Sequence, residues 1–334
     1  MSAKASGTCI LAVDLGGTKV AVAAISPQGE LLLRAEEPTR QDGPQAGIGQ
    51  IVQLLRELLL HRTSISSEEP LGVGVGIPAV LAEDDQVIWA PNLQGWRNVA
   101  LRPSLEQELG LPTVVEYDGH TAVLGEWWQG AGRGYRSVAM VIVGTGLGGG
   151  LILDGHLYRG GNQLAGAAGW FVLTTDTAGI SPQGKALGHW ESLAAGPGFA
   201  SRAQALLIAH PESSLYGYEP LTAKEIFEHA RAGDLFSMER VAELARLLGV
   251  GIANIVSLIN PEIVILGGSI GRQGDLLVDG IRTVVAEWAQ PVAARSVVIT
   301  SSQLGKDAGL YGAAYAVLAR MGLSESRDRR KVGI

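Results

Sequence analysis

The sequence predicts an α/β protein with two lobes, and three observations support this prediction. The chain has 334 residues, which exceeds the size at which a single hydrophobic core usually stops growing. Short apolar runs rich in β-branched residues are interspersed with longer stretches of helical spacing. A pattern of strand, glycine-rich turn and strand occurs twice, around residues 14–19 and around residues 144–150. One such unit is therefore expected in each lobe.

The first lobe is expected to begin with three short strands joined by tight turns. The apolar runs 10–13, 20–25 and 31–33 are its strands, and the motif DLGGTK and a Pro-Gln-Gly turn connect them. Hydrophobic spacing predicts four further elements. They are a helix over Ile48–His61, a buried strand over Leu71–Ile77, a strand over Thr113–Tyr117 and a helix over Asp118–Gln129.

The second lobe is expected to repeat this meander. A strand over Val138–Val143 leads into the glycine turn, and a strand over Gly150–Leu153 leads through an Asp-Gly hairpin signal to a returning strand. The later elements are a helix opened by a capping box at Thr222 and Glu225, a long apolar helix over 234–259, a strand over 262–266 and an Ala-rich helix over 308–320.

The second glycine motif, GTGLGGG at 144–150, also has the spacing G-x-G-x-x-G of dinucleotide-binding proteins. That fingerprint requires a helix to begin within the glycines, because the N-terminus of the helix holds the pyrophosphate. Here a strand follows, so we interpret the motif as one of two paired phosphate-binding hairpins. A stretch similar to a P-loop, Gly179–Lys185, is one residue short and is followed by Ala186 in place of the usual hydroxyl. It is given little weight.

Composition argues against several classes of function. The chain carries 26 basic and 33 acidic residues, a net charge of −7, which gives no general attraction to nucleic acid or to an anionic membrane. Cys9 is the only cysteine, so disulfides and Cys-based zinc sites are excluded. The apolar runs 9–13 and 247–259 are too short for a signal peptide and a membrane-spanning helix, respectively. A cytoplasmic protein is expected.

The motif DLGGTK combines groups that suit a nucleotide phosphate. Gly16 and Gly17 allow close approach of the backbone, and the N–H groups of such a turn can hold phosphate oxygens together with the Thr18 hydroxyl. Asp14, at the end of the first strand, is suited to hold Mg²⁺ through water. An ordinary tight hairpin is the alternative for this motif taken alone. The second glycine turn and the strand that ends in Gly267-Gly268 weaken that alternative.

Eight ordered segments resemble the ROK family of sugar kinases and sugar-responsive regulators, over about residues 10 to 320. They are DLGGTK (14–19), GIP (76–78), PNLQGW (91–96), VEYDGHTAVLGE (115–126), GTGLGGG (144–150), LYRGGNQLAG (157–166), NPEIVILGG (260–268) and LGKDAGLYGAA (304–314). The resemblance implies the two-lobed, actin-like ATPase (ribonuclease H-like) fold. With it we expect an N-terminal lobe over 1–118 completed by the C-terminal helix 308–322, a C-terminal lobe over 119–307 and a charged tail over 323–334.

The same resemblance implies a role for each matched position. Asp118 would be the general base that accepts the proton of the attacking hydroxyl, a role that a helix N-cap at the same position does not exclude. The sugar would be bound by Gly76, Asn92 and Trp170 together with Asp118. The ATP phosphates and adenosine would be held by Asp14, Gly16, Gly17, Thr18, Lys19, Gly144, Thr145, Gly146, Gly267 and Gly268, with Mg²⁺ on Asp14.

The chain departs from the family in two segments. The family's sugar kinases usually read A-G-E-x-G-H after the second hairpin, where Glu and His hold hydroxyls near C1 and C2 and the His also binds zinc. Ala167 and Trp170 stand at those two positions here, and of the usual zinc segment only Gly188 and Glu191 remain, with His189 at the last Cys. No structural zinc is therefore expected. The C1/C2 end of the sugar site is expected to be apolar, unless His120 or Glu191 supplies replacement donors.

The sequence thus predicts an ATP- and Mg²⁺-dependent kinase, a transferase that phosphorylates a hydroxyl of a sugar or sugar-like substrate. A homodimer is expected because it is common in the family. The alternative is a non-catalytic sugar- or nucleotide-sensing protein on the same fold. A DNA-binding regulator is not expected, because the first strand begins near residue 10 and leaves no room for a helix-turn-helix. Asp118 distinguishes the two, since a sensor would not need a carboxylate there.

Overall fold

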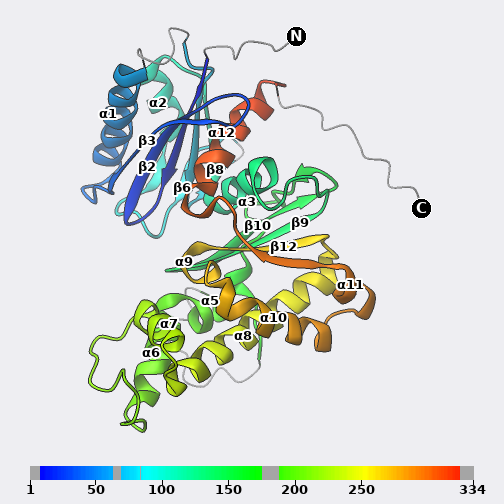
Figure 1. Cartoon of the computed structure of the whole chain (residues 1–334). Helices are drawn as coiled ribbons and strands as arrows, with labels where there is room; N and C mark the ends of the chain where they lie inside the picture. The colour runs from blue at the N-terminus through cyan, green and yellow to red at the C-terminus, as the bar shows by residue number, and fades with distance from the viewer. Residues whose placement is uncertain (1–7, 63–68, 83, 175–187, 324–334) are drawn as a thin grey trace. The chain divides into compact units, whose positions relative to one another are not determined.

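The computed structural model describes residues 8–62, 69–82, 84–174 and 188–323. These residues divide into two compact units, which are described separately below (Figure 1). Unit 1 comprises the chain up to Thr121 and from Gly309 onward, and unit 2 comprises Ala122–Ala308. The boundaries expected from the sequence fall after residues 118 and 307. Unit 1 is therefore discontinuous in sequence, and its last helix comes from the far end of the chain.

Unit 1 contains a five-stranded sheet in the order β3-β2-β1-β4-β8. Its first three strands form the expected antiparallel meander, and β4 and β8 then add in parallel to β1. Because β1, β4 and β8 are parallel, their carboxyl ends lie at the same edge of the sheet. The strands are β1 (Ile10–Leu15), β2 (Lys19–Ile25), β3 (Leu31–Pro38), β4 (Val73–Ile77) and β8 (Thr113–Tyr117).

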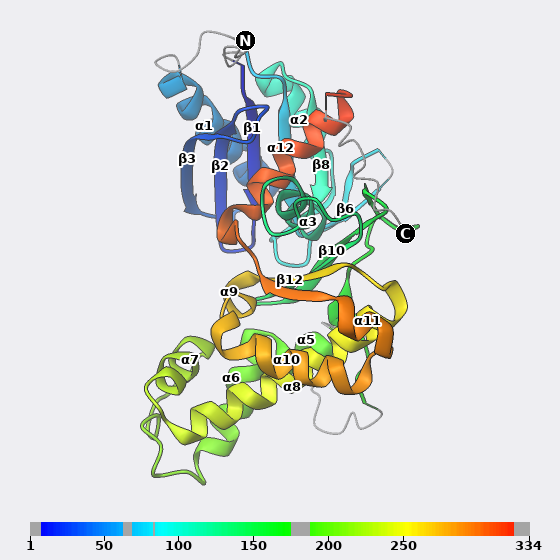
Figure 2. The same cartoon turned by 45° about the vertical axis from the view of Figure 1, so that its right-hand side comes forward.

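The alternation along LGVGVGI explains which helices cover each face of this sheet. Val73, Val75 and Ile77 point into a core shared with α1 (Pro44–Arg62) and α2 (Leu101–Leu109). The intervening glycines face the opposite side of the sheet and leave room for other helices. A Cβ at Gly74 would overlap the backbone of Ala313 in α12 (Ala308–Arg320). Figure 2 shows α12 running along the strands of the sheet. Small residues on alternate positions therefore admit a helix at backbone contact.

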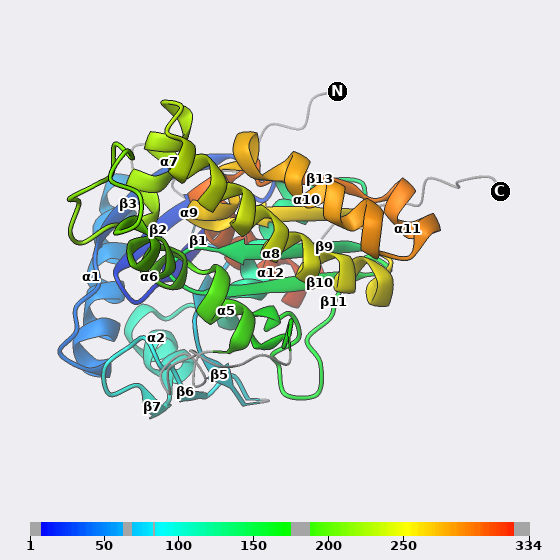
Figure 3. The ribbon, with the colours of Figure 1, turned by 90° about the horizontal axis from the view of Figure 1, so that it is seen from below.

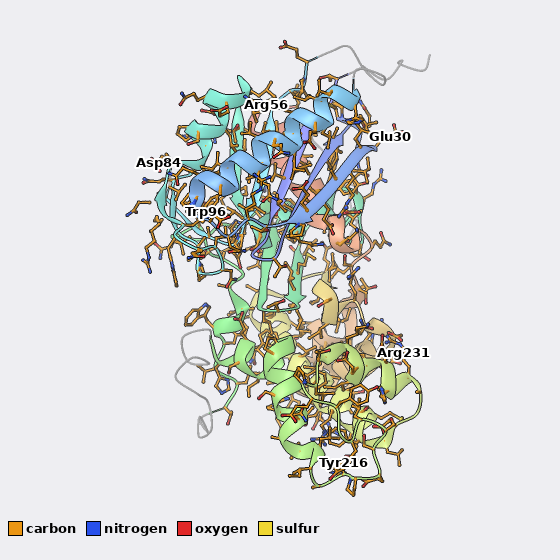
Figure 4. All side chains as sticks on the ribbon, turned by 90° about the vertical axis from the view of Figure 1, so that its left-hand side faces the viewer. Glu30, Arg56, Asp84, Trp96, Tyr216 and Arg231 are labelled. Carbon is orange, nitrogen blue, oxygen red and sulfur yellow. The ribbon has the colours of Figure 1, made fainter. Side chains whose placement is uncertain are left out.

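A small three-stranded sheet follows β4 and was not anticipated from the sequence. It has the order β5-β6-β7 and is made of Val80–Leu81, Val87–Trp89 and Arg97–Val99. The loop between β6 and β7 holds the segment PNLQGW and is anchored by Leu93 and Trp96, both nearly fully buried. Trp96 packs against the first turns of α1, where Gly47 leaves room for its ring (Figure 4).

Unit 2 repeats the topology of unit 1. Its sheet has the order β11-β10-β9-β12-β13, with antiparallel pairs β9–β10 and β10–β11 and parallel pairs β9–β12 and β12–β13. The repeated strand–turn–strand pattern in the sequence therefore reflects two related sheets. The strands are β9 (Val138–Val143), β10 (Leu147–Leu153), β11 (His156–Leu157), β12 (Ile263–Gly267) and β13 (Val298–Ser301).

The helices of unit 2 gather in a layer whose apolar residues share a core with β9 and β12. Helices α8 and α10 lie side by side in this layer (Figure 3). The capping box of Thr222 and Glu225 is present at the start of α7, as the sequence predicts. The elements are α5 (His189–Ala194), α6 (Gly196–Leu207), α7 (Ala223–Arg231), α8 (Leu235–Ile259), α9 (Gly268–Gly271), α10 (Gly274–Trp288), α11 (Pro291–Ser296) and the 3₁₀ turns Ala168–Trp170 and Gly305–Asp307.

Helix α8 is long and apolar enough to cross a membrane by length and composition alone. Its 25 residues exceed the apolar stretch 247–259 on which the sequence argument relied, so that argument from length was wrong. Packing gives the better reason to call α8 a core helix, because Leu244, Leu248 and Ile252 are fully buried in the unit 2 core. Asp234 caps its N-terminus by accepting a hydrogen bond from the Ser237 N–H.

Glu126 holds together two distant parts of unit 2. It lies in α3 (Asp118–Gln129), just past the first crossing between the units, and its side chain is completely buried. Its carboxylate accepts hydrogen bonds from the Leu304 N–H at 2.9 Å, the Ala131 N–H at 2.8 Å, the Gln303 N–H and the Ser302 hydroxyl. The carboxylate thereby fixes the segment that leads into the second crossing.

Candidate functional site

The carboxyl ends of the parallel strands in unit 1 bring together several predicted site residues. Asp14, near the end of β1, pairs in register with Gly76 of β4, and Gly76 pairs with Glu116 of β8. Asp118 follows directly after β8 and opens α3. In open α/β sheets, ligands bind outside this edge. The predicted magnesium ligand and the predicted base thus lie at one edge of the same sheet.

The hairpin DLGGTK is tightly built and contacts the predicted sugar residue. The Gly16 N–H donates to the Lys19 carbonyl at 2.9 Å, which closes the turn. The Thr39 hydroxyl holds the Gly16 carbonyl, so that oxygen is turned toward protein. A Cβ at Gly17 would lie 2.8 Å from the Asn92 carbonyl oxygen. Gly17 therefore permits the hairpin to touch the loop that carries Asn92, whose side chain is exposed.

Lys19, Gly76 and Asp14 each contact other parts of unit 1. Lys19 forms an ion pair with Glu36 on the neighbouring strand at 3.3 Å, so its role on phosphates stays a prediction. A Cβ at Gly76 would lie 2.6 Å from the Thr121 hydroxyl, which makes helix packing a sufficient reason for that glycine. A Cβ at Gly309, the second residue of α12, would lie 3.0 Å from the carboxyl carbon of Asp14. No pattern in the sequence indicates that α12 begins beside Asp14.

The Asp118 carboxyl has a pKa that is shifted toward neutrality. Burial raises the pKa of its carboxyl to about 6, against the opposing effects of the Gly119 N–H and of His120. The Gly119 N–H donates to its Oδ1 at 2.8 Å, so the carboxylate also serves the first turn of α3. A carboxylate with a pKa near neutrality is a better proton acceptor than an ordinary aspartate. His120 itself is buried, with its Nδ1 3.3 Å from Glu116, which argues against it as a sugar donor.

The second glycine hairpin lies in unit 2 and is shorter than expected. The turn comprises Gly144, Thr145 and Gly146 only, because β10 already begins at Leu147. The Gly144 N–H donates to the Gly146 carbonyl, and the Gly196 N–H at the start of α6 donates to the Gly144 carbonyl. Thr145 and Gly146 are exposed. A strand and not a helix follows the glycines, in agreement with the rejection of a dinucleotide-binding motif.

Gly267 and Gly268 lie beside this hairpin. Gly268 has a φ of +78°, and a Cβ there would overlap the Val143 carbonyl at the end of β9. The left-handed backbone and the close approach together account for glycine at this position. The next residue, Ser269, places its hydroxyl 3.5 Å from where a Cβ of Gly144 would be. The two glycine motifs predicted to bind ATP in unit 2 are therefore neighbours in space.

Glu191 is the side chain that the sequence argument undervalued. Its Oε2 accepts a hydrogen bond from the Leu147 N–H at 2.7 Å, just after the hairpin turn. Burial raises the pKa of its carboxyl, and this hydrogen bond opposes the rise. Its side chain also contacts Gly169, next to Trp170, whose indole is 60% exposed. The matched Glu191 was visible in the sequence, but its partner lies 44 residues away.

No described residues form a zinc site. In the ranges that the structure covers, no group of three or more His, Cys, Asp or Glu side chains is placed to hold a metal ion. Cys9 is buried beside β1 in unit 1, and His189 accepts a hydrogen bond from the Leu173 N–H. The segment 182–187 and the P-loop-like stretch Gly179–Lys185 lie outside the described residues. The described residues thus offer no donor set for zinc, whereas Asp14 offers the oxygen ligand that Mg²⁺ prefers.

Comparison with known proteins places these features in a family. The ROK family model matches residues 10–320. A glucokinase from Halalkalibacterium halodurans is 34% identical over 311 residues, covering 91% of this chain and 93% of its own. A xylose repressor from Caldicellulosiruptor bescii is 27% identical over 319 residues, covering 93% of this chain and 78% of its own.

A solved structure agrees with the fold predicted from the sequence. The ROK family glucokinase from Streptomyces griseus, in complex with glucose and AMPPNP, is 31% identical to this chain with a TM-score of 0.77. The likeness covers 92% of this chain and 98% of that one. The prediction of an α/β, actin-like ATPase fold is therefore confirmed.

Proposed function

The chain belongs to the ROK family, and from this premise we propose that it is an ATP- and Mg²⁺-dependent kinase of a sugar or sugar-like acceptor. The observation that carries the proposal is Asp118, a carboxylate at the carboxyl end of β8 whose pKa is raised to about 6. Phosphoryl transfer mainly requires positioning, charge neutralisation and one group that accepts the proton of the nucleophile. Relatives named glucokinases at about one-third identity support the same class of reaction.

In this proposal each half of the nucleotide site has its own task. The Gly16 and Gly144 N–H groups close their own turns, so the other backbone N–H groups of the hairpins 16–18 and 144–146 would bind the phosphates. Gly267 and Gly268 line the adenosine. Asp14 would hold Mg²⁺ through water, and Mg²⁺ bound there would supply neutralisation of the phosphate charge. Asp118 accepts the proton of the attacking hydroxyl, and Asn92 binds the hydroxyls of the acceptor.

The acceptor is proposed to differ from plain glucose at its C1/C2 end. Ala167 and Trp170 offer a methyl group and an exposed indole where the family usually has Glu and His. A buried sugar hydroxyl that faces them would lose its partners, at a cost of about 1–3 kcal/mol for each unpaired group. An indole face suits stacking on a ring or on an apolar substituent. Glu191 remains a candidate acceptor for a sugar hydroxyl, because its Oε1 accepts no hydrogen bond from the described residues.

A sensor without catalytic activity is the competing function, and the likeness to xylose repressors is the observation that favours it. Asp118 separates the two proposals. ATP turnover should be measured over a panel of free sugars, glycosides and cyclitols, for the wild type and for Asp118→Asn. A kinase gives turnover with at least one acceptor, and Asp118→Asn lowers kcat by about 10²–10⁴-fold while nucleotide still binds. Sugar binding without turnover on the whole panel would favour the sensor.

The location and assembly state belong to the same proposal. A cytoplasmic homodimer is proposed from the family resemblance, and sedimentation of the purified chain measures the assembly state directly.

A further inference from the structure

Two segments of unit 2 pack directly on each other: the strand that follows the nucleotide hairpin (144–146) and residues 165–170, here called the acceptor segment. Residues 165–170, where the family's sugar contacts would lie, pack directly on β10, the strand that begins at the hairpin turn. A Cβ at Gly166 would lie 2.5 Å from the Gly149 carbonyl oxygen, and one at Gly169 would overlap the Leu147 carbonyl. Only glycines allow two backbones to approach this closely. No layer of side chains separates the two segments at these points.

The Glu191 carboxylate interacts with both segments: it accepts a hydrogen bond at the start of β10 and contacts Gly169. Its Oε2 accepts from the Leu147 N–H at 2.7 Å, and the same oxygen lies 3.3 Å from the Cβ position of Gly169 and 3.0 Å from that of Gly146. The carboxylate therefore touches the end of the hairpin turn and the residue before Trp170. A displacement of the turn away from Glu191 must either carry the carboxylate with it or lengthen and weaken this hydrogen bond.

Helix α5, which carries Glu191, also packs on the residue that follows the acceptor segment. Trp190, the neighbour of Glu191, is completely buried and stacks on Phe171 with ring centroids 5.7 Å apart and an interplanar angle of 12°. The backbone N–H of Trp190 also donates to the Phe171 carbonyl at 3.0 Å. Because Phe171 follows Trp170 directly, the acceptor segment is held to α5 on one side and to β10 on the other. It is poorly placed to move independently of the hairpin.

We propose that Glu191 is a positioning residue that couples nucleotide binding to the acceptor segment. The inference rests on the proposed kinase function. A nucleotide that fixes the Gly144–Gly146 turn also fixes Leu147, Glu191 and residues 165–170, so the protein then loses less conformational entropy when the acceptor binds. Nucleotide and acceptor should therefore favour each other's binding, with a coupling of the size usual between protein sites, about 5-fold or more.

The experiment follows amide hydrogen exchange of the full chain with and without saturating AMPPNP and Mg²⁺, in the absence of any acceptor. In the wild type, exchange of residues 165–173 should slow by about 5-fold or more. Residues 223–231 of α7 are the internal control and should not change. In Glu191→Ala the slowing should fall below about 2-fold although AMPPNP still binds by calorimetry. Glu191→Gln keeps an oxygen that can accept from the Leu147 N–H, so it should restore most of the effect.

Fluorescence provides a second readout that does not depend on the Glu191 variants. AMPPNP should change the tryptophan emission of the wild type, Trp170→Phe should lose most of that change, and Trp288→Phe should retain it. Trp288 is the matched control, because it lies in the same unit and is 71% exposed against 60% for Trp170.

The outcomes separate this inference from the proposed function. AMPPNP binding that leaves residues 165–173 of the wild type unchanged would overturn the coupling and leave the kinase proposal standing. Unaltered protection in a folded Glu191→Ala variant would also overturn it, even if the acceptor KM rises, because Glu191 would then merely contact the acceptor. Absence of any nucleotide binding would overturn both proposals.

Discussion

Replacing Asp118 by Asn should stabilise the folded protein at neutral pH while it removes the proposed base. Burial raises the pKa of the Asp118 carboxyl from its usual 3.8 to about 6, so ionising this group is costly in the folded state. An amide carries no charge at any pH, and its oxygen can still accept the Gly119 N–H. The substitution thus removes the cost of burying a charge and keeps the local hydrogen bond.

The size and pH range of the effect follow from the two pKa values. A rise of about 2 pKa units corresponds to about 3 kcal/mol. Below pH 3.8 the carboxyl is protonated in both the folded and the unfolded chain, so the wild type and the variant should be equally stable. Between pH 3.8 and about 6 the unfolded chain loses this proton while the folded chain keeps it, so the wild type loses stability relative to the variant; the difference reaches its full value above about pH 7. Because Asp118 is partly open to solvent, about 3 kcal/mol is an upper value.

Urea denaturation at pH 5 and pH 7.5 measures the difference, with activity assayed in parallel. Asp118→Asn should gain about 1–3 kcal/mol at pH 7.5 and clearly less at pH 5, while kcat falls by about 10²–10⁴-fold. Asp279→Asn is the matched control, because Asp279 is almost fully exposed on α10 and should change stability by less than about 0.5 kcal/mol.

Two results would refute this reasoning. An Asp118→Asn variant that is less stable than the wild type at pH 7.5 would show that the carboxylate is well solvated or paired in its charged form. Near-normal turnover by the same variant would remove Asp118 from the proton transfer, whatever its effect on stability.

Three further predictions concern metal, acceptor and packing. Elemental analysis of the purified protein should find no stoichiometric zinc, and about one zinc per chain would contradict this. Among glucose and its 2-deoxy, 1-deoxy and 1-O-substituted analogues, kcat/KM should favour the analogues if Ala167 and Trp170 form an apolar end. A preference for glucose by about 10⁴-fold would mean that polar contacts persist there. Glu126→Leu should lower the free energy of unfolding by about 3 kcal/mol or more, since it leaves the Leu304 and Ala131 N–H groups unpaired. Ser104→Ala is the control, because the partly exposed Ser104 makes a local hydrogen bond to the Ala100 carbonyl; an equal loss of stability in both variants would contradict the prediction.

The best predictions from sequence were those where one local signal decides the structure. The strand over Thr113–Tyr117 and the helix from Asp118 have the bounds that the sequence suggested, because a run of β-branched residues ends there at a residue that starts helices. The α12 helix was predicted equally well. In each case hydrophobic spacing and the end signal agree.

The errors arose where glycine was taken for a turn. Residues 147–149 were assigned to the second hairpin turn, but they pair with β9 as part of β10. Gly149 is needed inside that strand because the Gly166 backbone approaches it, and such a reason cannot be read from the sequence around it. The small sheet and the helices α2, α5 and α6 were missed because their spacing is weak or their segments short, whereas α10 has helical spacing at Leu277, Ile281 and Val285 that was overlooked.

Contacts between distant residues lay beyond sequence reasoning altogether. The bond between Leu147 and Glu191 and the approach of Gly309 to Asp14 each join segments far apart in the chain. The motifs supplied the residues, but only the fold determines which of them meet. For Lys19 the motif predicts a phosphate contact, whereas the structure shows an ion pair with Glu36 on the neighbouring strand.

The discontinuity of unit 1 also has a consequence during protein synthesis. The ribosome makes strands β1, β4 and β8 first, yet Gly74 on the glycine face of β4 is covered by α12, which is made last. All of unit 2 is translated in between, and at roughly 5–20 residues per second this interval lasts on the order of ten seconds or more. Unit 2 has its complete sequence before unit 1 does. The nascent chain should therefore finish its second unit first, and a chain released before Gly309 should contain a folded unit 2 attached to a sheet that lacks its last helix.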